Sequence, residues 1–142
     1  MIRKARDLDA GALGAILSEF IDDTDWMPRI HTRAEDIAFA AQLIRGHKVF
    51  VIGAVRPVGF IALDQGSVDA FYVQKDQRGI GYGSKLIIHA QSLYQQLTLW
   101  TFQQNSQARK FYAYQGFDEV EFTNGAANDE GLPDVRLIWK AS

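Results

Sequence analysis

The stretch that decides the fold of this chain reads Val73-Gln74-Lys75-Asp76-Gln77-Arg78-Gly79-Ile80-Gly81-Tyr82-Gly83-Ser84. It lies between residues 68–73, which have the composition of a strand, and residues 86–93, whose apolar residues have helical spacing. Glycine allows the backbone to approach a ligand closely, and the first turn of a helix leaves amide groups unpaired. Those amides and the helix dipole attract phosphate. The stretch therefore predicts a phosphate-binding loop at the start of a helix.

Two familiar phosphate-binding loops do not fit this stretch. A Walker A loop ends in Gly-Lys-Ser or Gly-Lys-Thr, whereas this loop ends in Gly83-Ser84-Lys85. A dinucleotide-binding loop has the pattern G-x-G-x-x-G and an acidic residue about 20 residues later, at the end of the next strand. Here the spacing is G-x-G-x-G, and the next expected strand, 97–102, contains no acidic residue. The loop therefore disfavours a nucleotide-dependent enzyme of either kind.

A second motif supports a third interpretation of the glycine loop. Residues 105–117 have the pattern N-x-x-A-x-x-F-Y-x-x-x-G-F, and residues 78–83 have the pattern R-x-x-G-x-G. In this order the two motifs resemble those of the GNAT superfamily of acyl-CoA N-acyltransferases. The resemblance covers nearly the whole chain, because the expected N-terminal strand, two helices and hairpin also match. It implies the GNAT fold, an α/β fold with a mixed central sheet and helices on both faces.

The rest of the chain supplies the other expected elements. Apolar residues at helical spacing predict a helix over 9–20, and a capping box from Thr32 to Glu35 predicts a second helix that begins at Arg33 and ends at Gly46. Short β-branched runs on either side of Arg56-Pro57 predict a hairpin. Strands are expected at 1–5, 48–55, 58–63, 68–73, 97–102, 117–122 and 135–140, and later helices at 86–93 and 106–116.

The composition excludes several classes of function. The chain has 142 residues, which predicts a single domain over 1–142. Its 15 basic and 17 acidic residues give a net charge of −2, which argues against a nucleic-acid partner. The absence of cysteine excludes thiolate metal sites and a cysteine-linked acyl intermediate, so we expect no metal and a direct attack in a ternary complex. The longest apolar run, 49–55, is far too short to span a membrane, and the expected location is the cytoplasm.

The resemblance implies how acetyl-CoA would bind. The cosubstrate would lie where the strands 68–73 and 97–102 separate, with the backbone of Phe71 and Val73 pairing with its pantetheine arm. Asn105 would hydrogen-bond the same arm or cap its own helix, since Asn is a preferred N-cap residue. The pyrophosphate would be held by the amides and side chains of the glycine loop, namely Arg78, Gly79, Ile80, Gly81, Tyr82, Gly83 and Ser84.

The same resemblance implies the catalytic groups. Tyr112 has the position of the family's general acid, and the alternative is a core aromatic residue beside Phe111. An amine is mostly protonated at neutral pH and must lose a proton before it attacks. One branch of the family carries a glutamate where this chain has Trp100. The candidate bases are Asp69, which strict alternation places on the strand face of Val73, His31, or a chain of water molecules.

The acceptor side is expected at two loops. Trp26 and His31 belong to the segment between the first two helices, and Asn128, Glu130 and Asp134 lie at or before the last strand. With Trp100 they form the candidate substrate contacts, and the acidic residues suit a cationic amine. The acceptor can be a small-molecule amine or a peptide or protein amine, and the final hairpin offers a surface for a homodimer.

Two other functions stay open beside an active N-acetyltransferase. One is a CoA-binding module or sensor without catalysis, and the other is a nucleotide enzyme that uses the glycine loop. The presence of Tyr112 and Asp69 favours the enzyme over the module.

Overall fold

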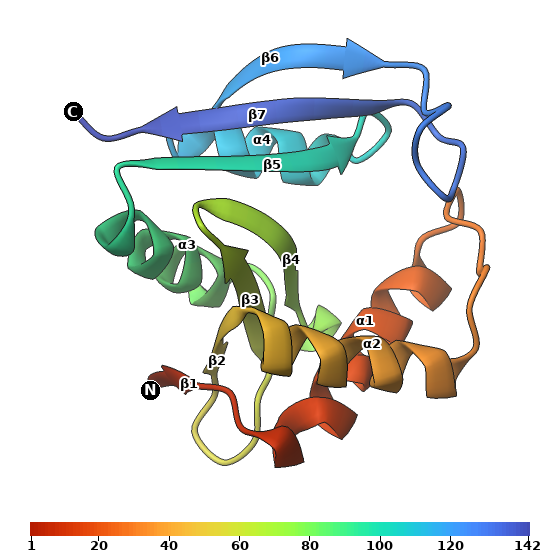
Figure 1. The fold of residues 1–142 in the computed structure, drawn as a ribbon, viewed down its shortest axis with the longest axis vertical. Helices are drawn as coiled ribbons and strands as arrows, with labels where there is room; N and C mark the ends of the chain where they lie inside the picture. Colours follow the sequence, from red (N-terminus) through yellow and green to blue (C-terminus); the bar gives the residue numbers. More distant parts are fainter.

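A computed structural model describes the whole chain, residues 1–142. One seven-stranded sheet has the order β1-β2-β3-β4-β5-β7-β6, with helices on both faces, so the expected α/β architecture is confirmed (Figure 1). The strands are β1 (Ile2–Lys4), β2 (Lys48–Ile52), β3 (Gly59–Asp64), β4 (Ser67–Val73), β5 (Gln96–Phe102), β6 (Asp118–Thr123) and β7 (Asp134–Lys140). The helices are α1 (Ala10–Asp23), α2 (Arg33–Gly46), α3 (Tyr82–Leu93) and α4 (Ser106–Tyr114), with 3-10 turns η1 (Asp7–Asp9) and η2 (Lys75–Gln77).

The strands β4 and β5 form the one parallel pair of the sheet, and all other neighbours are antiparallel. They pair at a single position, Ser67 with Thr98, where the Thr98 N–H donates to the Gly66 carbonyl at 2.9 Å. Beyond this point the two strands separate. Figure 1 shows β5, β7 and β6 on one side of this opening and β1 to β4 on the other. The sheet is therefore open along one edge of β4.

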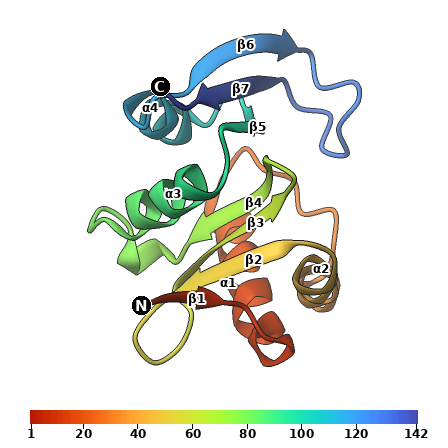
Figure 2. The ribbon, with the colours of Figure 1, turned by 60° about the vertical axis from the view of Figure 1, so that its left-hand side comes forward.

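Two hydrophobic cores lie on the two faces of the sheet. The helices α3 and α4 cover the first core, whose buried members include Leu86, Leu97 and Tyr112. The helices α1 and α2 cover the second, which includes Leu13 and Leu43. Figure 2 shows α3 and α2 on opposite sides of the central strands. Residues on successive positions of β4 therefore belong to different environments.

The pairing of β3 with β4 contains a bulge. Ala62 pairs with Ala70, but Leu63 pairs with Val68, so Asp69 is an extra residue on β4. As a result Val68 and Phe71 pack with the first core, whereas Ala70 and Tyr72 pack with the second. Strict alternation does not continue through a bulge, so alternation cannot be used to place Asp69 on the face of Val73.

The local signal at the start of α2 is confirmed, whereas α3 begins at Tyr82, earlier than the expected start at 86. The Thr32 hydroxyl accepts a hydrogen bond from the Glu35 N–H at 3.1 Å, and the Glu35 carboxylate accepts one from the Thr32 N–H at 2.8 Å. This is the capping box that the sequence predicts at the start of α2. None of the helices is both long enough and apolar enough to cross a membrane.

Candidate active site

A cleft of about 770 Å³ opens where β4 and β5 separate. One wall is β4 from Val68 to Val73, and the other is β5 from Leu99 to Phe102. The loop before α3 and the residues of α4 complete it, so the cleft is where the two sequence motifs meet. More than half of its 21 lining residues are hydrophobic, which suits a ligand with a long, mostly uncharged arm.

The open edge of β4 presents unpaired backbone groups to this cleft. The Gln74 N–H donates to the Val58 carbonyl at 2.7 Å, so the backbone groups of Gln74 and Tyr72 point toward β3. Those of Phe71 and Val73, one position away, point toward the cleft. The Arg78 side chain donates to the Val73 carbonyl at 2.8 Å and occupies that acceptor. The remaining groups can pair with an extended ligand as a neighbouring strand would.

The glycine loop leads from the end of β4 into α3. Gly79 and Gly81 have φ values of +78° and +98°, and a Cβ atom at either position would meet no atom within 4 Å. The backbone conformation, not lack of room, therefore requires glycine at these positions. The side chain of Ile80 is exposed, and that of Tyr82 packs against the first core, so neither lines the cleft. These two residues offer the ligand their backbone amides alone.

Asn105 performs the capping role that the sequence predicts. Its side-chain oxygen accepts a hydrogen bond from the Ala108 N–H at 3.1 Å at the start of α4. The residue also lines the cleft, and its amide NH₂ group points to no acceptor in the protein. Capping uses only the oxygen, so both expected roles are compatible in one side chain.

Tyr112 lines the cleft from α4. Its ring lies among Phe71, Phe111 and Phe117, with ring centroids 5.5–6.2 Å apart, and the residue is 7% exposed. Burial raises the pKa of its phenol well above the ordinary value, and the nearby Tyr72 adds to the shift. The hydroxyl therefore keeps its proton at neutral pH and can donate it. Tyr112 is at once a core residue and a wall of the cleft.

Sequence reasoning missed Tyr72, which lines the cleft from the other face of β4. Its ring contacts Phe20 of α1 and Phe60 of β3, with centroids 5.2 and 5.8 Å away. Burial raises the pKa of Tyr72 to about 12, and the carboxylates of Glu130 and Asp36 contribute. Strand alternation places Tyr72 and Phe71 on opposite faces of β4, but only the bulge shows that the face of Tyr72 packs with the second core.

Asp69 lies on the cleft wall at the bulge, exposed to solvent. Its carboxylate accepts a hydrogen bond from the Ser67 hydroxyl at 2.5 Å and lies 2.8 Å from Nε2 of His47. Nδ1 of His47 is buried without a partner, so the neutral tautomer that fits carries its proton on Nε2 and donates to Asp69. Asp64 lies within 4.8 Å of both, and these three side chains are the group that could hold a metal ion.

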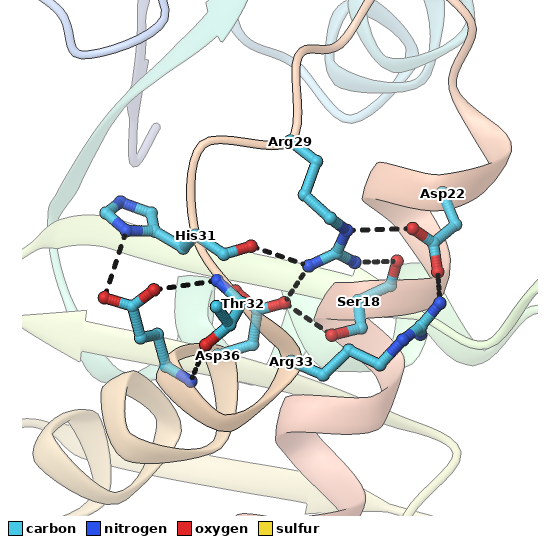
Figure 3. Close-up of polar contacts among 8 residues, drawn as sticks. Ser18, Asp22, Arg29, His31, Thr32, Arg33 and Asp36 are labelled. Atoms are coloured by element: carbon cyan, nitrogen blue, oxygen red, sulfur yellow. Dashed lines mark hydrogen bonds and ion pairs between the residues drawn. The ribbon is translucent and has the colours of Figure 1, made fainter.

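Arg29 lies in the segment between α1 and α2 and forms hydrogen bonds with residues of both helices, as Figure 3 shows. Arg29 bonds the Asp36 carboxylate and the Asp22 carboxylate, each at 2.9 Å, and the Ser18 carbonyl at 3.1 Å. Asp36 is buried and also accepts a hydrogen bond from the Ser18 hydroxyl. Arg29 therefore ties the loop to both helices that it connects.

Trp26 and His31, the two candidate substrate contacts in this segment, have different surroundings. Trp26 packs edge-on against Phe102 of β5, with ring centroids 5.7 Å apart; Phe102 lines the cleft, whereas Trp26 itself does not. His31 is exposed, lies 3.9 Å from the Glu35 carboxylate and does not line the cleft. Its expected roles as base or substrate contact are therefore not supported by its position, because the first turn of α2 holds it away.

Trp100 and Asp134, the other two candidate substrate contacts, also lie in different surroundings. Trp100 lines the cleft from β5 and is 48% exposed, as a substrate contact requires. The Asp134 carboxylate accepts hydrogen bonds from the Thr123 hydroxyl and from the Asn128 side chain. Asp134 does not line the cleft, so we correct its expected role: it braces the loop between β6 and β7.

Comparison with known proteins gives consistent matches. The family described as Acetyltransferase (GNAT) domain matches residues 45–119. The peptidyl-lysine N-acetyltransferase YjaB of Escherichia coli strain K12 is 34% identical over 118 residues, which cover 82% of this chain and 80% of YjaB.

Solved structures have the same fold. The apo form of YjaB from Escherichia coli superimposes with a TM-score of 0.83 at 28% identity, covering 100% of this chain and 98% of that one. The structure of yncA from Salmonella typhimurium with its cofactor acetyl-CoA has a TM-score of 0.75 at 18% identity, covering 100% of this chain and 94% of the other.

Proposed function

This chain belongs to the GNAT acetyltransferase family, and on that premise we propose that it transfers an acetyl group from acetyl-CoA to a lysine side chain of a peptide or protein. The observation that carries the proposal is the cleft between β4 and β5, which joins an open strand edge, a glycine loop and a buried phenol. The lysine acceptor is supported by the name of the relative YjaB, a peptidyl-lysine N-acetyltransferase.

Acetyl-CoA fits the residues of the cleft. The free backbone groups of Phe71 and Val73 would pair with the amides of the pantetheine arm. The open space around Gly79 and Gly81 lets the pyrophosphate approach the amides at the start of α3, where the helix dipole favours an anion. The free NH₂ group of Asn105 adds one donor on the opposite wall.

The proposed reaction is a direct attack by the neutral amine on the thioester carbonyl. The new C–N bond forms as the C–S bond breaks, and Tyr112 donates its proton to the departing sulfur. The attacking nitrogen releases one proton to Asp69, the carboxylate on the same cleft wall, and this proton then passes through solvent to restore the phenol of Tyr112. Backbone N–H groups of β4 would stabilise the charge that develops on the carbonyl oxygen.

The test uses the purified protein, acetyl-CoA and a short peptide with one lysine. We expect CoA thiol release together with a peptide that gains one acetyl group, and no modification of the same peptide with arginine in place of lysine. A protein that binds acetyl-CoA in calorimetry but transfers nothing to any of a panel of peptides and small amines would be the non-catalytic module instead.

A further inference from the structure

We propose that Tyr72 is a second catalytic hydroxyl in this cleft: its oxygen accepts a hydrogen bond from the attacking amine and orients the nitrogen toward the thioester. This role of Tyr72 rests on the proposed transfer reaction and adds the site at which the acceptor amine is held. It depends on the bulge at Asp69, which places the Tyr72 side chain on the face of β4 that packs with the second core.

The ring of Tyr72 is held rigidly. Phe20 contacts it from α1 and Phe60 from β3, with ring centroids 5.2 and 5.8 Å away. A side chain clamped in this way loses little further rotational freedom when a ligand binds. The position of its hydroxyl on the cleft wall is therefore set before an acceptor arrives.

The hydroxyl of Tyr72 has no hydrogen-bond partner in the protein, and it is not among the polar atoms that are closed off from solvent. Buried phenols normally pair their hydroxyl with a protein group. Tyr72 lines the cleft with a hydroxyl that has no partner in the protein, so this hydroxyl can bond a polar atom of a ligand.

The phenol of Tyr72 is neutral at the pH of the reaction, because burial raises its pKa. A neutral hydroxyl oxygen keeps lone pairs that can accept a hydrogen bond from the N–H of an amine.

Tyr112 and Tyr72 have different proposed roles in the reaction. Tyr72 and Tyr112 line the same cleft. Tyr112 gives its proton to the departing sulfur, whereas Tyr72 keeps its own proton and accepts a hydrogen bond from the nitrogen. The overall reaction remains amine plus acetyl thioester to amide plus thiol, with no additional reactant.

The test compares Tyr72→Phe with Tyr114→Phe, a matched control at a residue that is 88% exposed on α4. At saturating acetyl-CoA we expect Tyr72→Phe to lower kcat/KM for a lysine peptide about 10-fold, the effect of losing one hydrogen bond at an attacking atom. The dissociation constant for acetyl-CoA, measured by calorimetry, should change less than about 2-fold, and Tyr114→Phe should match the wild type in both measurements.

The outcomes separate the two proposals. A wild-type protein that acetylates no amine would refute the proposed function and, with it, the role of Tyr72. Wild-type transfer with an unchanged kcat/KM in Tyr72→Phe would refute the role of Tyr72 alone. That role would also be refuted if Tyr72→Phe weakened acetyl-CoA binding as much as it lowered kcat/KM for the peptide.

Discussion

Two glycines three residues apart in α1 offer a matched test of how α1 packs on α2. A Cβ atom at Gly14 would lie 2.7 Å from the Cα and Cγ1 atoms of Ile37, but a Cβ atom at Gly11 would meet nothing within 4 Å. Gly14 is buried and Gly11 is exposed. Gly14→Ala therefore pushes the backbone of α2 away from α1, whereas Gly11→Ala changes helix propensity alone.

The expected magnitudes have opposite signs. Alanine stabilises a helix interior relative to glycine by about 0.5–1 kcal/mol, so Gly11→Ala should raise the free energy of unfolding by that amount. At Gly14 the same gain is offset by overpacking, which costs about 1–3 kcal/mol. The contact is with backbone atoms that cannot rotate away, so the cost falls at the upper end and the net loss is about 1–2 kcal/mol. For a domain of this size we expect Tm to rise about 3 °C for Gly11→Ala and to fall about 4–8 °C for Gly14→Ala.

Urea and thermal unfolding, followed by circular dichroism, measure both variants against the wild type. A Gly14→Ala protein as stable as Gly11→Ala would show that α1 and α2 are not in close backbone contact at Ile37. Because α1 also carries Phe20 on the cleft wall, a true displacement of α1 should raise KM for the lysine peptide. It should leave the dissociation constant for acetyl-CoA unchanged, since neither Gly14 nor Ile37 lines the cleft.

Three further predictions concern the cleft. Tyr112→Phe should reduce kcat at least about 100-fold, the usual contribution of a general acid, with acetyl-CoA binding unchanged in calorimetry. Asn105→Asp keeps the capping oxygen for the Ala108 N–H but removes the NH₂ donor, so acetyl-CoA should bind more weakly while Tm stays the same. Asn105→Ala removes both groups, so it should weaken acetyl-CoA binding and also lower the free energy of unfolding by about 1 kcal/mol. Since the pKa of Tyr72 is raised to about 12 in the folded protein, its neutral form contributes stability that is complete below about pH 10 and is lost as pH rises through 12. Urea unfolding between pH 8 and 12 should therefore show a smaller alkaline loss in Tyr72→Phe, and an equal loss in both proteins would contradict the assigned shift.

The geometry of β4 explains why one strand can serve two purposes. Its backbone edge faces the cleft because β5 pairs with it only at Ser67. Its side chains point alternately to the two cores, so Phe71 supports Tyr112 on one face while Tyr72 reaches the acceptor half on the other. Cofactor binding and acceptor binding can thus use the same strand without competing for the same atoms.

Much of the site could be predicted from the sequence because its signals are local. The positive φ values of Gly79 and Gly81, the start of α3 behind them and the cap at Asn105 depend on residues within one helical turn. The positions of His31 and Asp134 could not be predicted in this way. Each depends on partners in another element: Arg29 bonds the His31 carbonyl while it bonds Ser18 and Asp22 of α1, and Thr123 of β6 bonds Asp134.

The sequence by itself determined the order of strands and helices, the glycine loop and the family motifs, because spacing, capping and turn residues act over a few neighbours. Only the tertiary structure decided which face of β4 each side chain occupies. The bulge at Asp69 arises from cross-strand pairing with β3, and one extra residue reverses every later position relative to strict alternation. That reversal places Tyr72 against Phe20 of α1, which also lines the cleft, and these two segments meet only when the helix packs on the sheet.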